Sequence, residues 1–129
     1  RISKNVSLSL ESGEPKGELP LSQPLFSWVL ENLLRNAVDA MEGEGTLSVR
    51  VAWEGDEVHV ELEDNGKGMS KSVARRVFEP GFTTKSRGWG LGLSLSKRIV
   101  EETHGGQLFV DWTEPGQGTR FKLVLRAQA

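Results

Sequence analysis

The hydrophobic period of the sequence changes several times along the chain, and this order constrains the fold most. Apolar residues recur at helical spacing over residues 25–41 and 91–103. Apolar and polar residues alternate, as in strands, over residues 6–10, 46–53, 57–64, 107–112 and 119–125, and the first of these predicts a half-buried strand. Ser70 is a suitable cap for a further short helix that ends near residue 78. The order β-α-β-β-α-α-β-β predicts an α+β fold, a two-layer α/β sandwich in which helices cover one face of a mixed, largely antiparallel sheet.

Length and composition exclude several classes of protein. The 129 residues predict a single domain spanning 1–129, and the start at Arg1 rather than Met suggests a fragment of a longer chain. A net charge of −2 with interspersed signs argues against a nucleic-acid partner. No apolar run approaches the length of a bilayer span, and the absence of cysteine is consistent with a reducing compartment.

Two asparagines stand out in the first predicted helix. Asn32 and Asn36 are four residues apart, so they share one face of a helix that otherwise packs through apolar residues. Buried amides need hydrogen-bonding partners, and a phosphate-bound cation would supply one. Two asparagines on a helix surface explain the pair equally well at this point.

Three further segments suit a nucleotide. Asp64 ends a predicted strand and precedes Gly66 and Gly68, so its carboxylate could accept from a base amino group where the backbone approaches closely. Residues 88–93, Gly-Trp-Gly-Leu-Gly-Leu, begin a helix whose N–H groups favour a phosphate. Residues 78–85 carry aromatic side chains followed by Lys85. Each segment alone is as well explained by an exposed turn or loop.

Taken in order, these segments resemble the conserved boxes of the GHKL superfamily of ATP-binding domains (gyrase, Hsp90, histidine kinase and MutL). The matching patterns are Asn32-x-x-x-Asn36-Ala37, Asp64-x-Gly66-x-Gly68, Phe78-x-Pro80-x-Phe82, Gly88-x-Gly90-Leu91-Gly92-Leu93 and Gly116-x-Gly118-Thr119-x-Phe121. The resemblance extends over residues 6–125. It implies the Bergerat fold, with a mobile ATP lid at residues 78–88.

The resemblance also implies a site for ATP or ADP with Mg²⁺. Asn36 would coordinate Mg²⁺ beside Asn32, and Asp64 would bind the adenine amino group with help, through water, from Thr119. Lys85 would offset charge at the β- and γ-phosphates, so Asn32, Asn36 and Lys85 are the expected catalytic residues. The remaining expected nucleotide-binding residues are Gly66, Gly68, Met69, Phe78, Thr83, Thr84, Arg87, Gly88, Gly90, Leu91, Gly92 and Leu93.

Within the superfamily, the sequence favours phosphoryl transfer over hydrolysis. ATPase members carry a glutamate four residues before the Mg²⁺-binding asparagine, and Asn32 occupies that position here. An amide cannot act as a base, and Glu31 points about 100° away around the helix, where it can pair with Arg35. Asn32, the Phe-Thr-Thr-Lys of residues 82–85 and the Gly-Leu-Gly-Leu helix start are similar to sensor histidine kinases of the nitrogen-regulator type.

The nucleophile expected of such a kinase is missing. The family's phosphoacceptor lies in a separate helical domain, in a His-Glu/Asp-x-x-x-Pro stretch that this sequence lacks. Structural roles are expected for both histidines: His59 should face solvent from a strand, and His104 sits at a helix C-terminus, where a cation is favoured. The implied partners are ATP, the kinase's own dimerisation domain and, through it, a response regulator. The fragment would be a monomer of a homodimeric kinase, located in the cytoplasm, either free or as the cytoplasmic part of a membrane-bound sensor.

Two alternatives remain open. One is a stand-alone GHKL serine kinase of the anti-sigma type, which is complete at about this length, and the other is a GHKL ATPase module that uses Glu31. Two residues depart from the common family pattern. Trp89 stands between glycines where Thr or Ser is frequent, and Asp39 lies one turn beyond Asn36, where an acid would repel phosphate.

Overall fold

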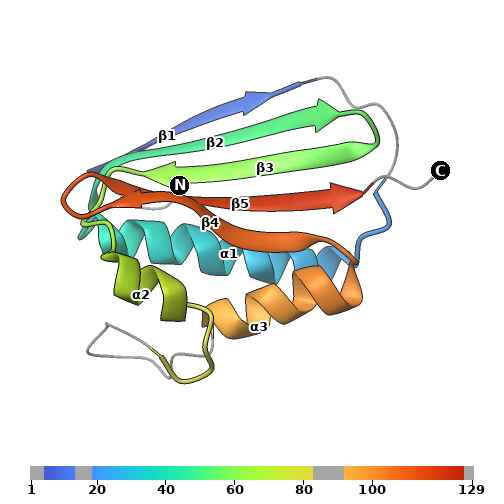
Figure 1. Ribbon diagram of the computed structural model, residues 1–129. Coiled ribbons are helices and arrows are strands. Elements are labelled where there is room, and N and C mark those ends of the chain that lie inside the picture. Colours follow the sequence, from blue (N-terminus) through green and yellow to red (C-terminus); the bar gives the residue numbers. More distant parts are fainter. Residues whose placement is uncertain (1–4, 14–18, 83–91, 127–129) are drawn as a thin grey trace.

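The chain folds into two layers, a twisted sheet and a layer of helices on one of its faces (Figure 1). The structure is a computed structural model and describes residues 5–13, 19–82 and 92–126. Its elements are β1 (Asn5–Ser12), α1 (Gln23–Ala40), β2 (Glu44–Glu54), β3 (Glu57–Asp64), α2 (Lys71–Arg76), α3 (Gly92–Arg98), η1 (Ile99–Thr103), β4 (Gln107–Glu114) and β5 (Gly118–Arg126). The predicted element order and α+β class are confirmed.

The sheet is mixed, as predicted. Its strand order is β1-β2-β3-β5-β4, in which β1 and β2 are parallel and the other neighbours are antiparallel. The predicted hairpin of residues 46–53 and 57–64 is present as β2 and β3. This order places the end of β3 beside the start of β5, with Asp64 opposite Thr119.

The core lies between the sheet and the helices because both layers present apolar residues at the matching period. Alternate residues of β3, Val58, Val60 and Leu62, are buried against a stripe of α1 that contains Val29 and Leu33. Leu108 and Leu123 of neighbouring strands β4 and β5 are fully buried in the same cluster. None of the helices among the described residues is long and apolar enough to cross a bilayer.

The prediction of a half-buried first strand is wrong for most of β1. Leu8 and Leu10 face the side of the sheet that carries the helices, opposite Leu47 and Val49 of β2, but 55% and 68% of their surfaces are exposed. The reason is the position of the strand: β1 is an edge strand, and the helices pack over the strands farther in. Only Val6 packs against a buried cluster, with Met41 and Leu47.

The second long helix is regular only in its first half. Residues 91–103 were expected as one α-helix, but a π-helical turn, η1, follows α3. His104 stabilises this wide turn because its Nδ1 lies 2.9 Å from the Ile99 carbonyl oxygen. Its Nε2 accepts from the Ser22 N–H at 2.9 Å, so the proton is on Nδ1 and the ring is neutral in this arrangement. The structural role is as predicted, whereas the cationic form is not the one these contacts use.

Candidate nucleotide-binding site

Helix α1 connects the two ends of the candidate site. Asn32, Asn36 and Ala40 occupy successive turns on one side of the helix. Asn32 contacts the first residue of α3, and the Ala40 carbonyl accepts from Lys67 N–H, at 2.9 Å, in the loop after β3. Eight residues of α-helix extend about 12 Å, which leaves room for a base at one end and phosphates at the other. Asn36 is half-buried between them.

The glycine-rich start of α3 packs directly on the Asn32 side chain. A Cβ atom on Gly92 would lie 2.5 Å from Asn32 Oδ1, closer than real Cβ contacts allow. One turn further along α3, Ser96 is fully buried, and its Oγ accepts from Asn32 Nδ2 at 3.0 Å. The two contacts place the amide nitrogen toward Ser96 and the amide oxygen next to the helix N-terminus. Leu93, the next predicted residue, is half-buried against the main core.

The loop after β3 is held close to its neighbours at both glycines. Gly66 lies against the Ala40 carbonyl, and Gly68 lies against the Glu114 carbonyl with a φ of +67°. A side chain at either position would collide with backbone, and Gly68 also needs a left-handed conformation that other residues rarely adopt. Gly66 and Lys67 therefore lie against the end of α1, in the loop where the sequence analysis expects an adenine slot.

Asp64 is a buried carboxylate. Only 5% of the residue is exposed, and its Oδ1 accepts from Gly66 N–H at 2.8 Å. Burial raises the pKa of Asp64 above its usual value of 3.8, although backbone hydrogen bonds from Gly66 and Thr119 act in the opposite direction. Asp64 and Thr119 are cross-strand partners on the same face of the sheet. Two oxygen-bearing side chains are thus side by side at the predicted base position.

Thr113 is a member of this group that the sequence did not indicate. Its Oγ1 lies 2.8 Å from Thr119 Oγ1, and it also accepts from Met69 N–H at 2.9 Å. The only available signal was its place in β4, two residues before the Pro115 turn, and that signal does not point to a site. The contact across 44 residues with Met69 appears only in the folded chain.

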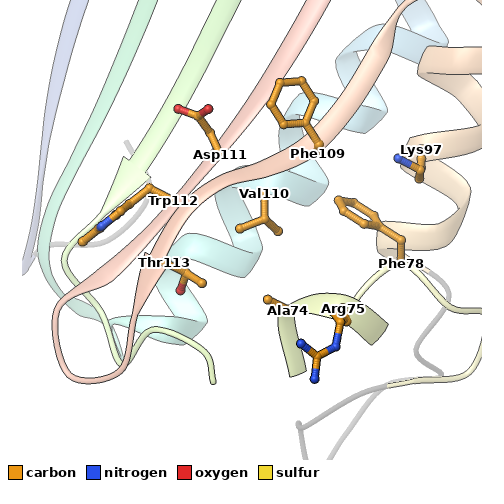
Figure 2. A pocket seen from close by; sticks show the side chains of 9 residues that line it. All are labelled: Ala74, Arg75, Phe78, Lys97, Phe109, Val110, Asp111, Trp112 and Thr113. Atoms are coloured by element: carbon orange, nitrogen blue, oxygen red, sulfur yellow. The ribbon is translucent and has the colours of Figure 1, made fainter. Parts of the chain in front are cut away.

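Phe78 packs against the main core cluster. Its ring packs edge-on against Phe121, with centroids 6.0 Å apart, and Lys97 Nζ lies 4.7 Å from its centroid. Figure 2 shows Phe78 and Lys97 beside a groove of about 420 Å³ between α2, α3 and β4. Among the members of the predicted nucleotide set that the structure describes, Phe78 alone lines this groove.

Several predicted residues lie outside the described part of the chain. They are Thr83, Thr84, Lys85, Arg87, Gly88, Gly90 and Leu91, together with Trp89 and most of the predicted lid.

Glu31 is exposed on α1, and Asp39 is exposed near the end of that helix. His59 lies on the outer face of the sheet, but the expectation that it faces solvent is wrong, because its side chain is only 15% exposed. Glu57 Oε1 lies 3.1 Å from its Nε2, and Glu54 Oε2 lies 3.3 Å from its Nδ1 without hydrogen-bonding geometry.

The residues present fit a magnesium ion that keeps most of its ligands from phosphate and water. Mg²⁺ prefers oxygen ligands and rarely has an all-protein cage. Asn32 Oδ1, beside Gly92, and the amide oxygen of Asn36 are possible metal ligands on one side of α1. Within residues 5–13, 19–82 and 92–126, no group of three or more His, Cys, Asp or Glu side chains could hold a metal ion. The amides are therefore suited to a shared cation rather than to a closed metal centre.

Comparison with known proteins identifies the family. Residues 22–129 match the family described as "Histidine kinase-, DNA gyrase B-, and HSP90-like ATPase". The chain is 39% identical over 124 residues to the alginate biosynthesis sensor protein KinB of Pseudomonas aeruginosa. The alignment covers 95% of this chain but only 20% of KinB.

The nucleotide-free catalytic domain of the histidine kinase ThkA superposes with a TM-score of 0.83 at 26% identity, covering 95% of this chain and 79% of that one. Full-length ShkA in complex with AMPPNP gives a TM-score of 0.80 at 26% identity, covering 98% of this chain and 27% of ShkA. The chain belongs to the GHKL family of histidine kinase-, gyrase B- and Hsp90-like ATPase domains.

Proposed function

We propose that this chain is the ATP- and Mg²⁺-binding catalytic domain of a two-component sensor histidine kinase. In this role it donates the γ-phosphate of ATP to a histidine on a separate dimerisation domain. The observation that carries the proposal is the position of Asn32, whose amide is held by Ser96 against the start of α3. An amide that is fixed there can hold a cation that neutralises and orients phosphates, but it cannot activate water.

The base end of the site supports an adenine nucleotide. Asp64 is buried, is opposite Thr119, and lies in a loop whose glycines let the backbone approach a flat ligand. Gly66, Gly68 and Met69 form that loop. The family match and the AMPPNP complex of ShkA are consistent with this assignment.

The phosphate end is formed by Asn32, Asn36, Gly92 and Leu93, to which we add the undescribed residues Thr83, Thr84, Lys85, Arg87, Gly88, Gly90 and Leu91. When Mg²⁺ is bound, it supplies charge neutralisation between phosphate oxygens. Phosphoryl transfer requires mainly positioning and charge stabilisation, so this chain needs no base of its own when a nucleophile is delivered to it. We assign Phe78 a supporting role, since its ring packs on Phe121 and Lys97.

The partners follow from the missing nucleophile. His104 is hydrogen-bonded to Ser22 and Ile99, and His59 is 15% exposed and lies next to two glutamates, so neither is presented to a phosphate. The phosphoacceptor histidine is on a dimerisation domain of the same protein, which passes the phosphate to a response regulator in the cytoplasm. The 129 residues then act as one catalytic domain, monomeric alone and part of a homodimer in the whole kinase.

A reconstitution experiment tests the proposal. The chain is mixed with radiolabelled ATP and Mg²⁺, with and without the dimerisation domain of its parent protein, and label on protein is measured. We expect label only on the added domain, and its loss in Asn36→Ala. Label on His59 or His104 of the chain alone would contradict transfer to a separate domain. Steady hydrolysis of ATP that is abolished by Glu31→Gln would instead support an ATPase.

A further inference from the structure

Thr113 lies at the centre of a small hydrogen-bond network beneath the base end of the site. Its Oγ1 receives the Met69 N–H at 2.9 Å, lies 3.0 Å from the Gly118 carbonyl oxygen and lies 2.8 Å from Thr119 Oγ1. Gly118 is buried and Thr119 is 3% exposed. Water therefore has little access to the Gly118 and Thr119 side of this network, whereas Thr113 itself is half-buried and lines the groove of Figure 2.

The number of protons decides the direction of each bond. A threonine hydroxyl has one proton to donate and can accept two hydrogen bonds. The Gly118 carbonyl can only accept, so the Thr113 proton points to it. Met69 N–H fills one acceptor position of Thr113 Oγ1, and the other faces Thr119. The Thr119 hydroxyl must therefore donate its proton to Thr113. With the Thr113 proton on Gly118, any other orientation of the Thr119 hydroxyl would leave lone pairs of the two threonine oxygens facing each other.

This direction leaves Thr119 with only lone pairs for a ligand. Its cross-strand partner, Asp64, is 5% exposed and, when ionised, can also only accept. Both side chains at the base end are then acceptors. An amino group, or a water molecule that an amino group orients, meets complementary partners there, whereas a carbonyl oxygen meets oxygens that cannot donate to it.

We infer that Thr113 is a positioning residue that holds the Thr119 hydroxyl as an acceptor and thereby sets the preference of the site for an adenine over a guanine nucleotide. The inference rests on the nucleotide function proposed above. Thr113 acts through Thr119 and touches no ligand atom itself.

Substitution of Thr113 by valine tests the inference, because valine has nearly the same shape and lacks the hydroxyl. In Thr113→Val the Thr119 proton is released and can turn toward the ligand, where it can serve a carbonyl oxygen. We expect the ratio of the dissociation constants for GTP and ATP, measured by calorimetry, to fall by about tenfold, which corresponds to one hydrogen bond. Thr113→Ser keeps the hydroxyl and should retain the ratio of the unchanged chain.

A measurement without nucleotide separates this role from a loss of folding. In the free chain the Met69 amide should be protected from hydrogen exchange in the unchanged chain and in Thr113→Ser, and should lose protection in Thr113→Val. The Leu123 amide in the core should stay protected in all three. An unchanged GTP-to-ATP ratio in a folded Thr113→Val chain would overturn the inference, as would equal behaviour of the serine and valine variants. If the unchanged chain bound neither nucleotide, the proposed function would fail instead.

Discussion

Asn32 Nδ2 lies 3.0 Å from Ser96 Oγ, and this hydrogen bond joins α1 to α3 across 64 residues of sequence. The bond turns the oxygen of the amide toward Gly92 at the helix start. Ser96 is fully buried, yet it determines which atom of Asn32 faces the start of α3. The geometry of the proposed phosphate end therefore depends on a serine inside the core.

The first prediction concerns this serine. Ser96→Ala leaves the amide of the half-buried Asn32 without its acceptor, so we expect the free energy of unfolding to fall by about 1 kcal/mol. The affinity for ATP with Mg²⁺ should fall as well, because the Asn32 amide is free to rotate. Urea unfolding and calorimetry check the two effects. Ser27→Ala, at an exposed position on α1, serves as the control and should change stability by less than about 0.5 kcal/mol.

A second prediction concerns the close packing of Gly92. Gly92→Ala adds a Cβ atom at 2.5 Å from Asn32 Oδ1, so the asparagine or the helix start must move. Alanine favours a helix by about 1 kcal/mol over glycine, but we expect the collision to outweigh this gain and to weaken nucleotide binding about tenfold. In Gly13→Ala the nearest atom to the new Cβ is the Val51 carbonyl oxygen at 3.8 Å, and this variant should bind normally. Normal binding by Gly92→Ala would show that Asn32 does not need its present position.

A third prediction concerns Lys97, which joins α3 to the edge strand. Its Nζ donates to the Leu108 carbonyl at 2.7 Å, pairs with Glu101 at 3.0 Å and lies over the Phe78 ring. Lys97→Met keeps the aliphatic chain and removes the charge, and we expect a loss of about 1–2 kcal/mol in the free energy of unfolding. The loss should be accompanied by faster hydrogen exchange at Leu108.

The neighbouring residue provides a matched control for Lys97. Arg98 pairs with Glu102 at the same i,i+4 spacing, but both side chains are more than two-thirds exposed. Arg98→Met should therefore cost less than about 0.5 kcal/mol. Equal costs for the two variants would mean that the contacts of Lys97 to Leu108 and Phe78 add nothing beyond a surface ion pair.

The fold was predictable because its elements differ in hydrophobic period and because turns separate them. Helix α1 and the hairpin of β2 and β3 have clear local signals, and three of the glycines that approach backbone closely, Gly66, Gly68 and Gly118, fall in the family boxes. The exposure of β1 was not predictable, because an alternating pattern does not reveal whether any helix lies over the strand. The wide turn of η1 depends on the contact of His104 with Ile99.

The parts of the site that the sequence missed are partners of predicted residues. Ser96 and Thr113 are ordinary polar residues in a helix and a strand. Their roles come from contacts with distant parts of the sequence: Ser96 with Asn32, which is 64 positions away, and Thr113 with Met69, which is 44 positions away. Local patterns carry no information on such pairings. The low exposure of His59 has a different origin, because Glu54 and Glu57 are close to it in sequence, and an alternating pattern does not reveal how neighbouring side chains cover a ring on the outer face of the sheet.

The last prediction separates binding from stability at Asp64. In Asp64→Asn the side-chain oxygen can still accept from Gly66 N–H, while the buried charge is removed. We expect ATP affinity to fall about tenfold, because a charged acceptor for the adenine amino group is lost. The free energy of unfolding at pH 7 should not fall and should rise if desolvation outweighs the backbone hydrogen bonds. Unchanged ATP affinity would show that the adenine does not lie at Asp64.

The pH dependence of this variant follows from the direction of the pKa shift. Burial raises the pKa of Asp64 in the folded chain above the value of 3.8, so the fold disfavours the ionised form. That cost is present in full above the folded pKa and disappears as the pH falls toward the unfolded value. The stability advantage of Asp64→Asn over the unchanged chain should therefore be largest at pH 7 and should shrink as the pH is lowered to about 4. Asp56→Asn removes an exposed carboxylate that pairs with Arg126, and the same urea titrations should show no such advantage at pH 7. An advantage of Asp64→Asn that grew on acidification would mean that hydrogen bonds, and not desolvation, dominate at this carboxylate.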